Sequence, residues 1–376
     1  MSQSLRRMTF PDSKLCVCCL LTVLGIGILI LPVANGSSAT QGRIVLNVGG
    51  PGAWDGYSVF RPFVISSNSS YMMWYSGESV YVVDGIGFAN STDGIAWTRY
   101  AKNPVLSVGG VGEWDHGRVN DAWVIHEKGI YKMWYTGVLY MAFTKLIVAE
   151  QIGYATSPDG LNWTKYPGNP VVAYGPKGSL NDKWVYRPVV ISTGSSYMMY
   201  YGFLSQTDTY GFGVATSPDG ISWTKLKPLT MTSSSWDAYD PSIGSITPAG
   251  NRLLMAYSAQ SAAGYPSQIG LANSTDGSSW TTFSKNPVVT GGVASAWDGA
   301  GVSDAMIVSL GDHYNLYYTG SKNDGTSRIG LATLPTAQIS IPEFSTGTYA
   351  ALAGLALTIF SVLHRNIRLS KKNSEN

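Results

Sequence analysis

Short runs of alternating apolar and polar residues repeat along the middle of the chain, each bounded by glycine, proline, aspartate or serine. In the first copy a run that begins at Ile86 is followed by Asp93-Gly94 and then by Trp97. An Asp-Gly pair between two such runs predicts a β-hairpin turn, and the tryptophan begins the second strand. The same order recurs around Asp159, Asp219 and Asp276, and a fifth copy from Ile329 to Pro335 ends before the turn.

Two further apolar runs precede each hairpin copy, for example Arg61 to Ile65 and the aromatic run Tyr71 to Tyr75. Four predicted strands per unit and five units are typical of a five-bladed β-propeller. The stretch from Val45 to Asp55 matches Val105 to Asp115, so the repeats begin where a blade ends. We therefore expect an all-β propeller in which the segment Arg43 to Asn47 supplies the outer strand of blade five and closes the ring.

Apolar segments lie near both ends of the chain. Basic residues precede the run from Leu15 to Val33, which predicts a signal peptide or an N-terminal membrane anchor. A second run, Tyr349 to Leu363, is followed by a basic tail, so the positive-inside rule places both tails in the cytoplasm and the propeller outside the cell membrane. The expected domains are residues 1–39 as signal or anchor, 40–338 as propeller, and 339–376 as a C-terminal sorting or anchor segment.

The C-terminal segment also resembles an archaeal sorting signal, because Pro342-Glu343-Phe344 precedes the apolar run and the basic tail. This resemblance implies an archaeal source, with an archaeosortase-like enzyme as processing partner.

Composition narrows the classes of partner and cofactor. Charged residues make up 13% of the chain and the formal net charge is +2, so no basic field favours a nucleic-acid partner. All three cysteines, Cys16, Cys18 and Cys19, lie in the N-terminal apolar segment, which leaves none for a disulfide or metal site in the propeller. We expect no cofactor; a carboxylate Ca²⁺ site is a weaker alternative, since no loop has a ligand spacing that demands it.

The Asp-Gly turns are expected to be structural, because aspartate before glycine is ordinary turn chemistry. Sequons for N-glycosylation lie in or near turns on the same face, at Asn68, Asn90, Asn162 and Asn273. Sugars there would leave the opposite mouth of the channel open.

The positions that open the innermost strands are expected to lie at one level of a central funnel. They are Arg61, Asp121, Arg187, Asp240 and Asp304. One interpretation is that arginine–aspartate pairs cross-link the strands and plug the channel. The other is that Asp240 and Asp304 repel one another, so that one carboxyl acquires a raised pKa and acts as an acid while the other acts as a base. In that case Arg61 and Arg187 would hold substrate oxygens or an anion.

Other candidates lie around the rim. Repeated Trp-Asp pairs are interpreted as structural caps of the loops, and they occur at Trp54-Asp55, Trp114-Asp115, Trp236-Asp237 and Trp297-Asp298, with Asp182-Lys183-Trp184 as an altered copy. Unrepeated residues that could stack on or hydrogen-bond a sugar are Tyr57, His116, Asn120, Tyr186 and Tyr239. The stretch Val138 to Glu150 lengthens one rim loop and could form a wall, a lid or a contact surface.

The blade motif resembles the five-bladed propellers of glycoside hydrolase families 32, 43 and 130, which include β-fructosidases, arabinanases and mannoside phosphorylases. The resemblance rests on Tyr-x-Met-Trp-Tyr, Gly-x-Ala-x-Ser-x-Asp-Gly-x-x-Trp and Asn-Pro-Val, and it spans residues 42–335. It implies cleavage of glycosidic bonds by a carboxylate pair, often with a third acid. Asp240 and Asp304 match the aspartate position, but no glutamate opens an inner strand, and Glu78 or Glu113 could substitute only if their loops fold inward.

Two hypotheses follow. The first is a cell-surface, glycan-active hydrolase-like protein with Asp240, Asp304 and Asp121 as its acids. The second is a non-catalytic propeller that binds carbohydrate or a protein partner at the cell envelope, with those aspartates held in salt bridges by Arg61 and Arg187. The separation and the ion pairing of the carboxylates distinguish the two.

Overall fold

The computed structural model describes residues 42–67, 70–80, 85–141, 146–226, 228–232 and 234–336. The apolar segments predicted at residues 15–33 and 349–363 lie outside these ranges, and their role as anchors stays a prediction. Within the described ranges, no helix has the length and apolar character needed to cross a membrane.

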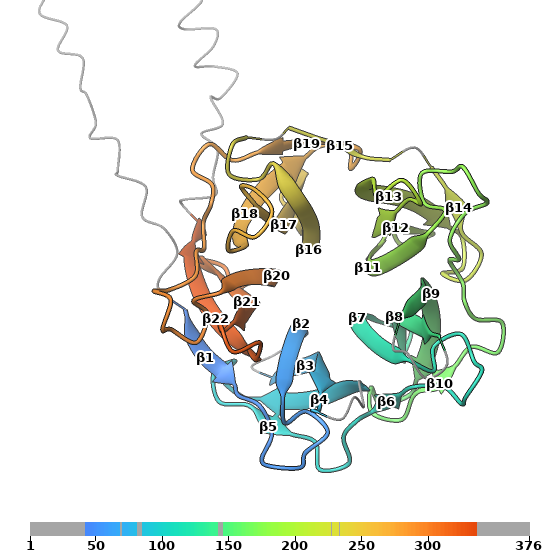
Figure 1. Cartoon of the computed structure of the whole chain (residues 1–376), viewed down its shortest axis with the longest axis horizontal. Coiled ribbons are helices and arrows are strands. Elements are labelled where there is room, and N and C mark those ends of the chain that lie inside the picture. The colour runs from blue at the N-terminus through green and yellow to red at the C-terminus, as the bar shows by residue number, and fades with distance from the viewer. Residues whose placement is uncertain are drawn as a thin grey trace, which may run out of the picture. The chain divides into compact units, whose positions relative to one another are not determined.

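The described residues form five sheets around a central axis, which confirms the predicted all-β, five-bladed propeller (Figure 1). Blade one contains β2 (Ser58–Ser67), β3 (Ser70–Glu78), β4 (Gly85–Ser91) and β5 (Thr98–Arg99), with β6 (Leu106–Ser107) paired to β4. Blade two contains β7 (Arg118–Glu127), β8 (Ile130–Tyr140), β9 (Ile147–Ser157) and β10 (Thr164–Lys165). In both blades the strands follow one another outward from the axis.

Blades three and four have the same order. Blade three contains β11 (Trp184–Ser192), β12 (Tyr197–Leu204), β13 (Tyr210–Ser217) and β14 (Thr224–Lys225). Blade four contains β16 (Tyr239–Ala249), β17 (Arg252–Gln260), β18 (Gln268–Ser274) and β19 (Ser279–Thr282), with the short strand β15 (Thr230–Met231) added to β19 in parallel.

Blade five is completed by the start of the described chain. Its strands are β20 (Gly301–Ser309), β21 (His313–Ser321), β22 (Ser327–Pro335) and β1 (Arg43–Leu46). The pairing of β1 with β22 is antiparallel, with Arg43 opposite Leu331. Figure 1 shows β1 beside β22 in this blade. The predicted closure of the ring by the segment that begins at Arg43 is therefore confirmed, and it covers an edge that would otherwise be open to pairing.

Neighbouring blades are joined through the Asp-Gly turns. Trp74 Nε1 donates a hydrogen bond to the carbonyl oxygen of Gly160 in the next blade at 2.9 Å. Across the closure, the Tyr317 hydroxyl donates to the carbonyl oxygen of Gly94 at 2.9 Å. Blade five has no Asp-Gly turn, and the equivalent residue facing it from blade four is Ala256, whose side chain has no donor. Each such bond stabilises the fold by about 1 kcal/mol net.

The Asp-Gly turns themselves have the structural role predicted for them. Asp93 Oδ1 accepts hydrogen bonds from the amides of Ile95 and Ala96, both at 2.8 Å. Asp159, Asp219 and Asp276 accept the equivalent pairs of bonds. These bonds to the ionised carboxylates lower the pKa of each of the four aspartates.

The inner strands of blades four and five come into close backbone contact at Gly244. A Cβ atom at this position would lie 2.6 Å from both the nitrogen and the oxygen of Ala305. Ser245 Oγ fixes this approach by donating to the Ala305 carbonyl oxygen at 2.9 Å. The backbone contact therefore requires glycine.

Gly244→Ala is expected to lower the free energy of unfolding by about 1–3 kcal/mol, because the two inner strands must move apart to admit a methyl group. Gly50→Ala is the matched control, since nothing lies within 4 Å of a Cβ placed there. Urea unfolding followed by tryptophan fluorescence measures both. Equal stability of the two variants would show that the strands can separate without cost.

Candidate functional site

A β-bulge interrupts four of the five inner strands at the same place. In β2, two residues, Arg61 and Pro62, lie opposite a single residue of β3, Tyr75. The inner strands of blades two, three and five have the same arrangement. The first residue of each bulge has a left-handed backbone, with φ of 53° at Arg61, 57° at Asp121, 56° at Arg187 and 54° at Asp304. Such a conformation costs a non-glycine residue roughly 1–3 kcal/mol and is typical of sites where a bulge redirects a side chain.

Hydroxyl groups of the preceding blade hold three of these bulges in place. Each accepts a hydrogen bond from the backbone amide of the first bulge residue. The pairs are Arg61 with Thr319 at 2.9 Å, Asp121 with Ser76 at 3.2 Å, and Arg187 with Thr136 at 2.9 Å. The contacts between blades therefore fix the backbone from which the charged side chains project.

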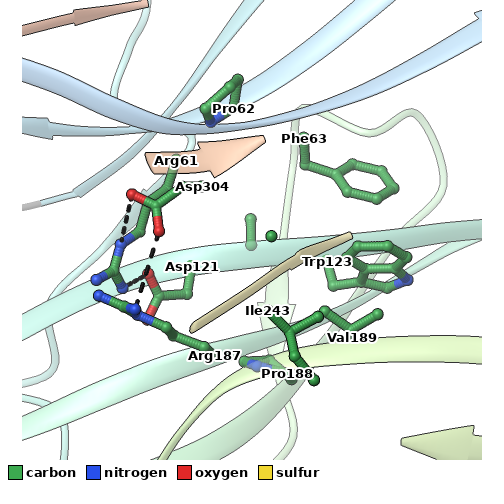
Figure 2. A pocket seen from close by; sticks show the side chains of 12 residues that line it. Arg61, Pro62, Phe63, Asp121, Trp123, Arg187, Pro188, Val189, Ile243 and Asp304 are labelled. Carbon is green, nitrogen blue, oxygen red and sulfur yellow. Dashed lines mark hydrogen bonds and ion pairs between the residues drawn. The ribbon is translucent and has the colours of Figure 1, made fainter. Parts of the chain in front are cut away.

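The four redirected side chains point toward one another in the channel (Figure 2). Arg61 Nη1 forms a hydrogen-bonded ion pair with Asp121 Oδ1, and Arg61 Nε lies 3.7 Å from Asp304 Oδ2. Arg187 Nη1 lies 4.0 Å from Asp304 Oδ1. The four groups form a neutral cluster, which we call the inner ring, in which cations alternate with anions.

The inner ring faces a cavity of about 370 Å³, counting the space at its open mouth. Its wall is charged on one side and apolar on the other, where Phe63, Trp123, Val189 and Ile243 lie (Figure 2). Two buried polar atoms of the ring, Asp121 Oδ2 and Arg187 Nε, have no hydrogen-bond partner among the described residues. Such atoms are rare in folded proteins and are normally satisfied by water or a ligand.

The pKa of Asp304 is shifted in the opposite direction to the one expected from repulsion by Asp240. Burial is the strongest influence and opposes ionisation, but the charges of Arg61 and Arg187 and hydrogen bonds from Ser303 and Thr319 together outweigh it, so the pKa is lowered. Asp304 is therefore an ionised group. Burial and repulsion by Arg187, partly offset by Asp304, lower the pKa of Arg61 to about 10.

The expectation that Asp240 lies at the same level as the other four residues is wrong. In β16, Asp240 and Pro241 form a bulge of their own opposite Ala259, and a second bulge places Ile243 opposite Tyr257. Ile243 is therefore the blade-four residue at the level of the inner ring. Asp240 lies three residues nearer the start of the strand, where it is exposed, has a φ of 46° and makes no ion pair within the described ranges.

Glu150 is a carboxyl that sequence reasoning did not single out. The stretch Val138 to Glu150 is largely an extension of the β8–β9 hairpin, in which Val138 pairs with Arg118 on one side and Glu150 on the other. Residues in one such row share a face of the sheet. Burial, the largest influence, raises the pKa of Glu150, and the opposing charges of Arg61, Arg187 and Arg118 do not cancel it. The signal that could have identified Glu150 is a glutamate that lies in register with an arginine, Arg118, through Val138.

Tyr186 connects the inner ring with the two outer carboxyls. The guanidinium carbon of Arg187 lies 5.7 Å from the centre of the Tyr186 ring. Burial raises the pKa of Tyr186 to about 12, Arg187 opposes this, and the charges of Glu150 and Asp240 add to it. Glu150 and Asp240 therefore both act electrostatically on one hydroxyl. Tyr239, with 46% of its surface exposed, adjoins Asp240.

Three further rim residues were predicted to contact a sugar: Asn120, His116 and Tyr57. Asn120 precedes Asp121 and is buried, with no hydrogen-bond partner for Oδ1 in the described part of the chain. His116 Nδ1 lies 2.9 Å from the carbonyl oxygen of Glu113, which places it in a local turn. Tyr57 is half-buried beside Gly325 in the β21–β22 loop. Their roles as sugar ligands stay predictions.

Of the two glutamates considered as substitute acids, Glu113 serves its own loop, since Oε2 accepts the Gly110 amide at 3.0 Å. Glu78 Oε1 lies 3.7 Å from Arg118 Nη2 in the outer part of the site. Neither is held in the inner ring.

The Trp-Asp pairs do cap the loops. In each of the four blades that carry a pair, the aspartate accepts a hydrogen bond from the hydroxyl of the tyrosine in strand two, at distances from 2.7 to 3.2 Å. The interpretation of Asp182-Lys183-Trp184 as the copy in blade three is wrong, because Asp182 instead accepts the amides of Gly178 and Gln206. Leu180 and Asn181 occupy the loop positions of the tryptophan and aspartate there.

Of the predicted sequons, Asn90 and Asn162 have exposed side chains, while Asn273 Oδ1 accepts a hydrogen bond from Arg252 at 3.0 Å. Asn68 lies outside the described residues. Among the residues that the structure describes, no three His, Cys, Asp or Glu side chains come together in a way that could hold a metal ion.

A sequence profile of β-1,4-mannooligosaccharide phosphorylases, glycoside hydrolase family 130, matches residues 231–338, a stretch that contains Asp240 and Asp304. An uncharacterized protein of Mycobacterium tuberculosis, found in two strains, is 28% identical over 222 residues, which cover 57% of this chain and 71% of the relative.

Solved structures share the architecture. The structure of a glycoside hydrolase has a TM-score of 0.63 and 17% identity, covering 79% of this chain and 92% of that one. A glycoside hydrolase family 130 structure, described in connection with β-1,2 mannosidic linkages in Candida mannan, has a TM-score of 0.55 and 20% identity, covering 74% and 85%. The chain has a glycoside-hydrolase-like propeller fold. The predicted resemblance is thereby confirmed.

A further structure with this propeller is an N-acetylgalactosamine deacetylase from F. plautii in complex with blood group B trisaccharide. Its TM-score is 0.62 at 13% identity, and it covers 80% of this chain and 96% of that one. At these identities the glycosidase-like propellers agree in fold, and function has to be argued from the site.

Arg61→Met is expected to lower the free energy of unfolding of this glycosidase-like propeller by roughly 3–5 kcal/mol, because it leaves the Asp121 carboxylate buried without its partner. The Asp121 side chain is only 5% exposed. Adding Asp121→Asn removes that charge and should recover part of the loss. Urea unfolding near neutral pH compares the three proteins. If the double variant is no more stable than Arg61→Met, the pairing of Arg61 with Asp121 is not what the ring depends on.

Proposed function

We propose that this chain binds a glycan at the mouth of the central channel and cleaves a glycosidic bond there. The observation that carries the proposal is the separation of carboxyl groups into two kinds. Burial raises the pKa of Glu150, whereas Asp240 is exposed and makes no ion pair in the described ranges, and the charges of both act on the Tyr186 hydroxyl. A glycosidase needs one carboxyl that holds a proton and one that does not.

The inner ring provides the polar contacts for a sugar. Asp121 Oδ2 and Arg187 Nε are buried without partners in the described ranges, so ligand hydroxyls can satisfy them. The apolar wall at Phe63, Trp123 and Ile243 suits the carbon face of a sugar ring. Charge, hydrogen-bonding groups and an apolar surface thus meet in one cavity.

In the proposed reaction, Glu150 gives its proton to the glycosidic oxygen as the bond from that oxygen to the anomeric carbon breaks. Asp240 takes a proton from the water whose oxygen forms the new bond to the anomeric carbon. Asp240 suits this role because it is exposed to solvent and free of ion pairs in the described part of the chain. If inorganic phosphate replaces water as the acceptor, the same acid serves and the product is a sugar phosphate.

Similarity to known proteins supports this choice of reaction. The matching profile is named for a mannooligosaccharide phosphorylase, and the propellers that share the fold include glycoside hydrolases. Within the proposal, the apolar end segments hold the protein in the cell membrane, with the propeller facing extracellular carbohydrate.

A second candidate function is a non-catalytic propeller that binds glycans. The ion pair between Arg61 and Asp121, together with the two arginines around Asp304, favours it, because two of the three predicted catalytic aspartates are engaged in the inner ring. Glu150 and Asp240 are outside those pairs, so the assignment of acid and base to them distinguishes the enzyme from the binding protein.

Glu150→Gln is expected to reduce glycoside cleavage by about 10²–10⁴-fold, because the amide cannot donate the catalytic proton. Turnover of chromogenic glycosides by the full-length protein, with and without phosphate, measures the effect. Glu113→Gln is the matched control: it changes a rim glutamate whose oxygen is used within its own loop, and its turnover should equal that of the unaltered protein.

The pH dependence of glycoside cleavage is set by the same group, Glu150. Because the reaction needs protonated Glu150 and its pKa is raised, activity should fall on the alkaline side only above the ordinary range of a glutamate. Glycan binding without turnover by the unaltered protein would favour the binding function. Turnover that survives Glu150→Gln with an unchanged pH profile would remove Glu150 as the acid.

A further inference from the structure

The loop before the inner strand of blade three has the same backbone frame as its counterparts in blades one and two. The Gly49 amide donates to the Asp55 carbonyl oxygen at 3.0 Å in blade one, and Gly109 donates to that of Asp115 at 3.2 Å in blade two. In blade three, Gly175 donates to the carbonyl oxygen of Asn181 at 2.8 Å. Leu180 and Asn181 therefore stand where the other four blades have tryptophan and aspartate.

In the other blades the indole covers a glycine of strand three, the one paired with the tyrosine of strand two. A Cβ atom at that glycine would lie 2.3 to 2.8 Å from the indole, as measured at Gly87, Gly153, Gly270 and Gly330. The equivalent residue in blade three is Gly213, which pairs with Tyr201. The three atoms nearest to a Cβ there all belong to the Tyr201 side chain.

The missing indole leaves a pocket. Leu180 is 56% exposed, and beside it lies a cavity of about 410 Å³, counting its open mouth. Tyr201, Phe203, Gly213 and Pro228 supply most of its apolar lining.

The same substitution removes a counter-ion. In blade one Arg99 Nε lies 2.8 Å from Asp55, and in blade two Lys165 Nζ lies 2.7 Å from Asp115. Lys225 holds the equivalent position in blade three, paired with Ala215 as Lys165 is with Ala155.

Because Asn181 is neutral, Lys225 Nζ donates instead to the carbonyl oxygen of Ala173 at 2.6 Å. Lys225 has no carboxylate partner in the described part of the chain, although it lines the pocket together with Asn181.

We infer that this pocket of blade three binds a ring that carries a carboxylate. Such a ligand restores both groups that Leu180 and Asn181 leave out: its flat apolar face packs on Tyr201 and Gly213, and its carboxylate pairs with Lys225. An acidic sugar such as a uronic acid residue, or an aromatic carboxylic acid, has this chemistry. The pocket is separate from the channel, and the inference does not rest on catalysis there.

Calorimetric titration of the full-length protein tests the inference with three probes: digalacturonate, the uncharged sugar galactobiose, and indole-3-acetate. Saturable binding of digalacturonate or indole-3-acetate, with the uncharged sugar at least about tenfold weaker, is expected from loss of a charge-assisted hydrogen bond. Binding of digalacturonate alone identifies an acidic sugar as the ligand, and binding of indole-3-acetate alone identifies an aromatic acid.

Two variants locate the binding. Leu180→Trp refills the space and Asn181→Asp restores the counter-ion of Lys225, so each should weaken binding of the anionic ring by about tenfold or more. Each introduces the residue that the other four blades carry at that position and should leave any glycoside cleavage in the channel unchanged. Glu150→Gln should leave the anionic ring bound as tightly as before.

No saturable binding of either anionic probe by the unaltered protein would overturn the inference, as would binding that neither variant weakens. Because Leu180 and Asn181 lie outside the channel site, failure here leaves the proposed cleavage reaction untouched, and the reverse also holds.

Discussion

The bulge that places one left-handed residue in each of four inner strands is the constraint on which the site depends. Without the extra residue, the side chains of Arg61, Asp121, Arg187 and Asp304 would follow the ordinary alternation of a strand and would not converge. The strained backbone persists because hydroxyl groups of neighbouring blades hold it and because the ring is closed by β1. The geometry of the site therefore depends on closure of the propeller.

Convergence of four charged groups determines how the nearby carboxyls ionise. At Asp304 the charges of Arg61 and Arg187, with hydrogen bonds from Ser303 and Thr319, outweigh burial. At Glu150 burial outweighs the charges of Arg61, Arg187 and Arg118. The pKa values of the two carboxyls are therefore shifted in opposite directions. The opposite shifts arise from the balance between burial and the charges of nearby arginines, and a raised carboxyl pKa is what the proposed acid requires.

The blades could be predicted from sequence because the same strand and turn motifs recur in each of them. The closure could be predicted because the segment from Val45 to Asp55 matches the end of a blade, so the repeats begin where a blade ends. The level of Asp240 could not, since Asp-Pro has the same appearance whether or not a second bulge follows in β16. Glu150 was missed because its place depends on pairing across the long β8–β9 hairpin. In blade three, Asp182 and Trp184 resemble the Trp-Asp motif in sequence. The sequence therefore did not show that Leu180 and Asn181 hold the loop positions of the motif.

The most direct test of this account is a carboxyl ¹³C NMR titration of the full-length protein, with Glu150→Gln and Asp304→Asn used to assign the two resonances. We expect Glu150 to titrate above the ordinary range of a glutamate and Asp304 to titrate below the ordinary range of an aspartate. A Glu150 resonance that titrates at or below the ordinary value would contradict this expectation, because the site would then hold no protonated acid.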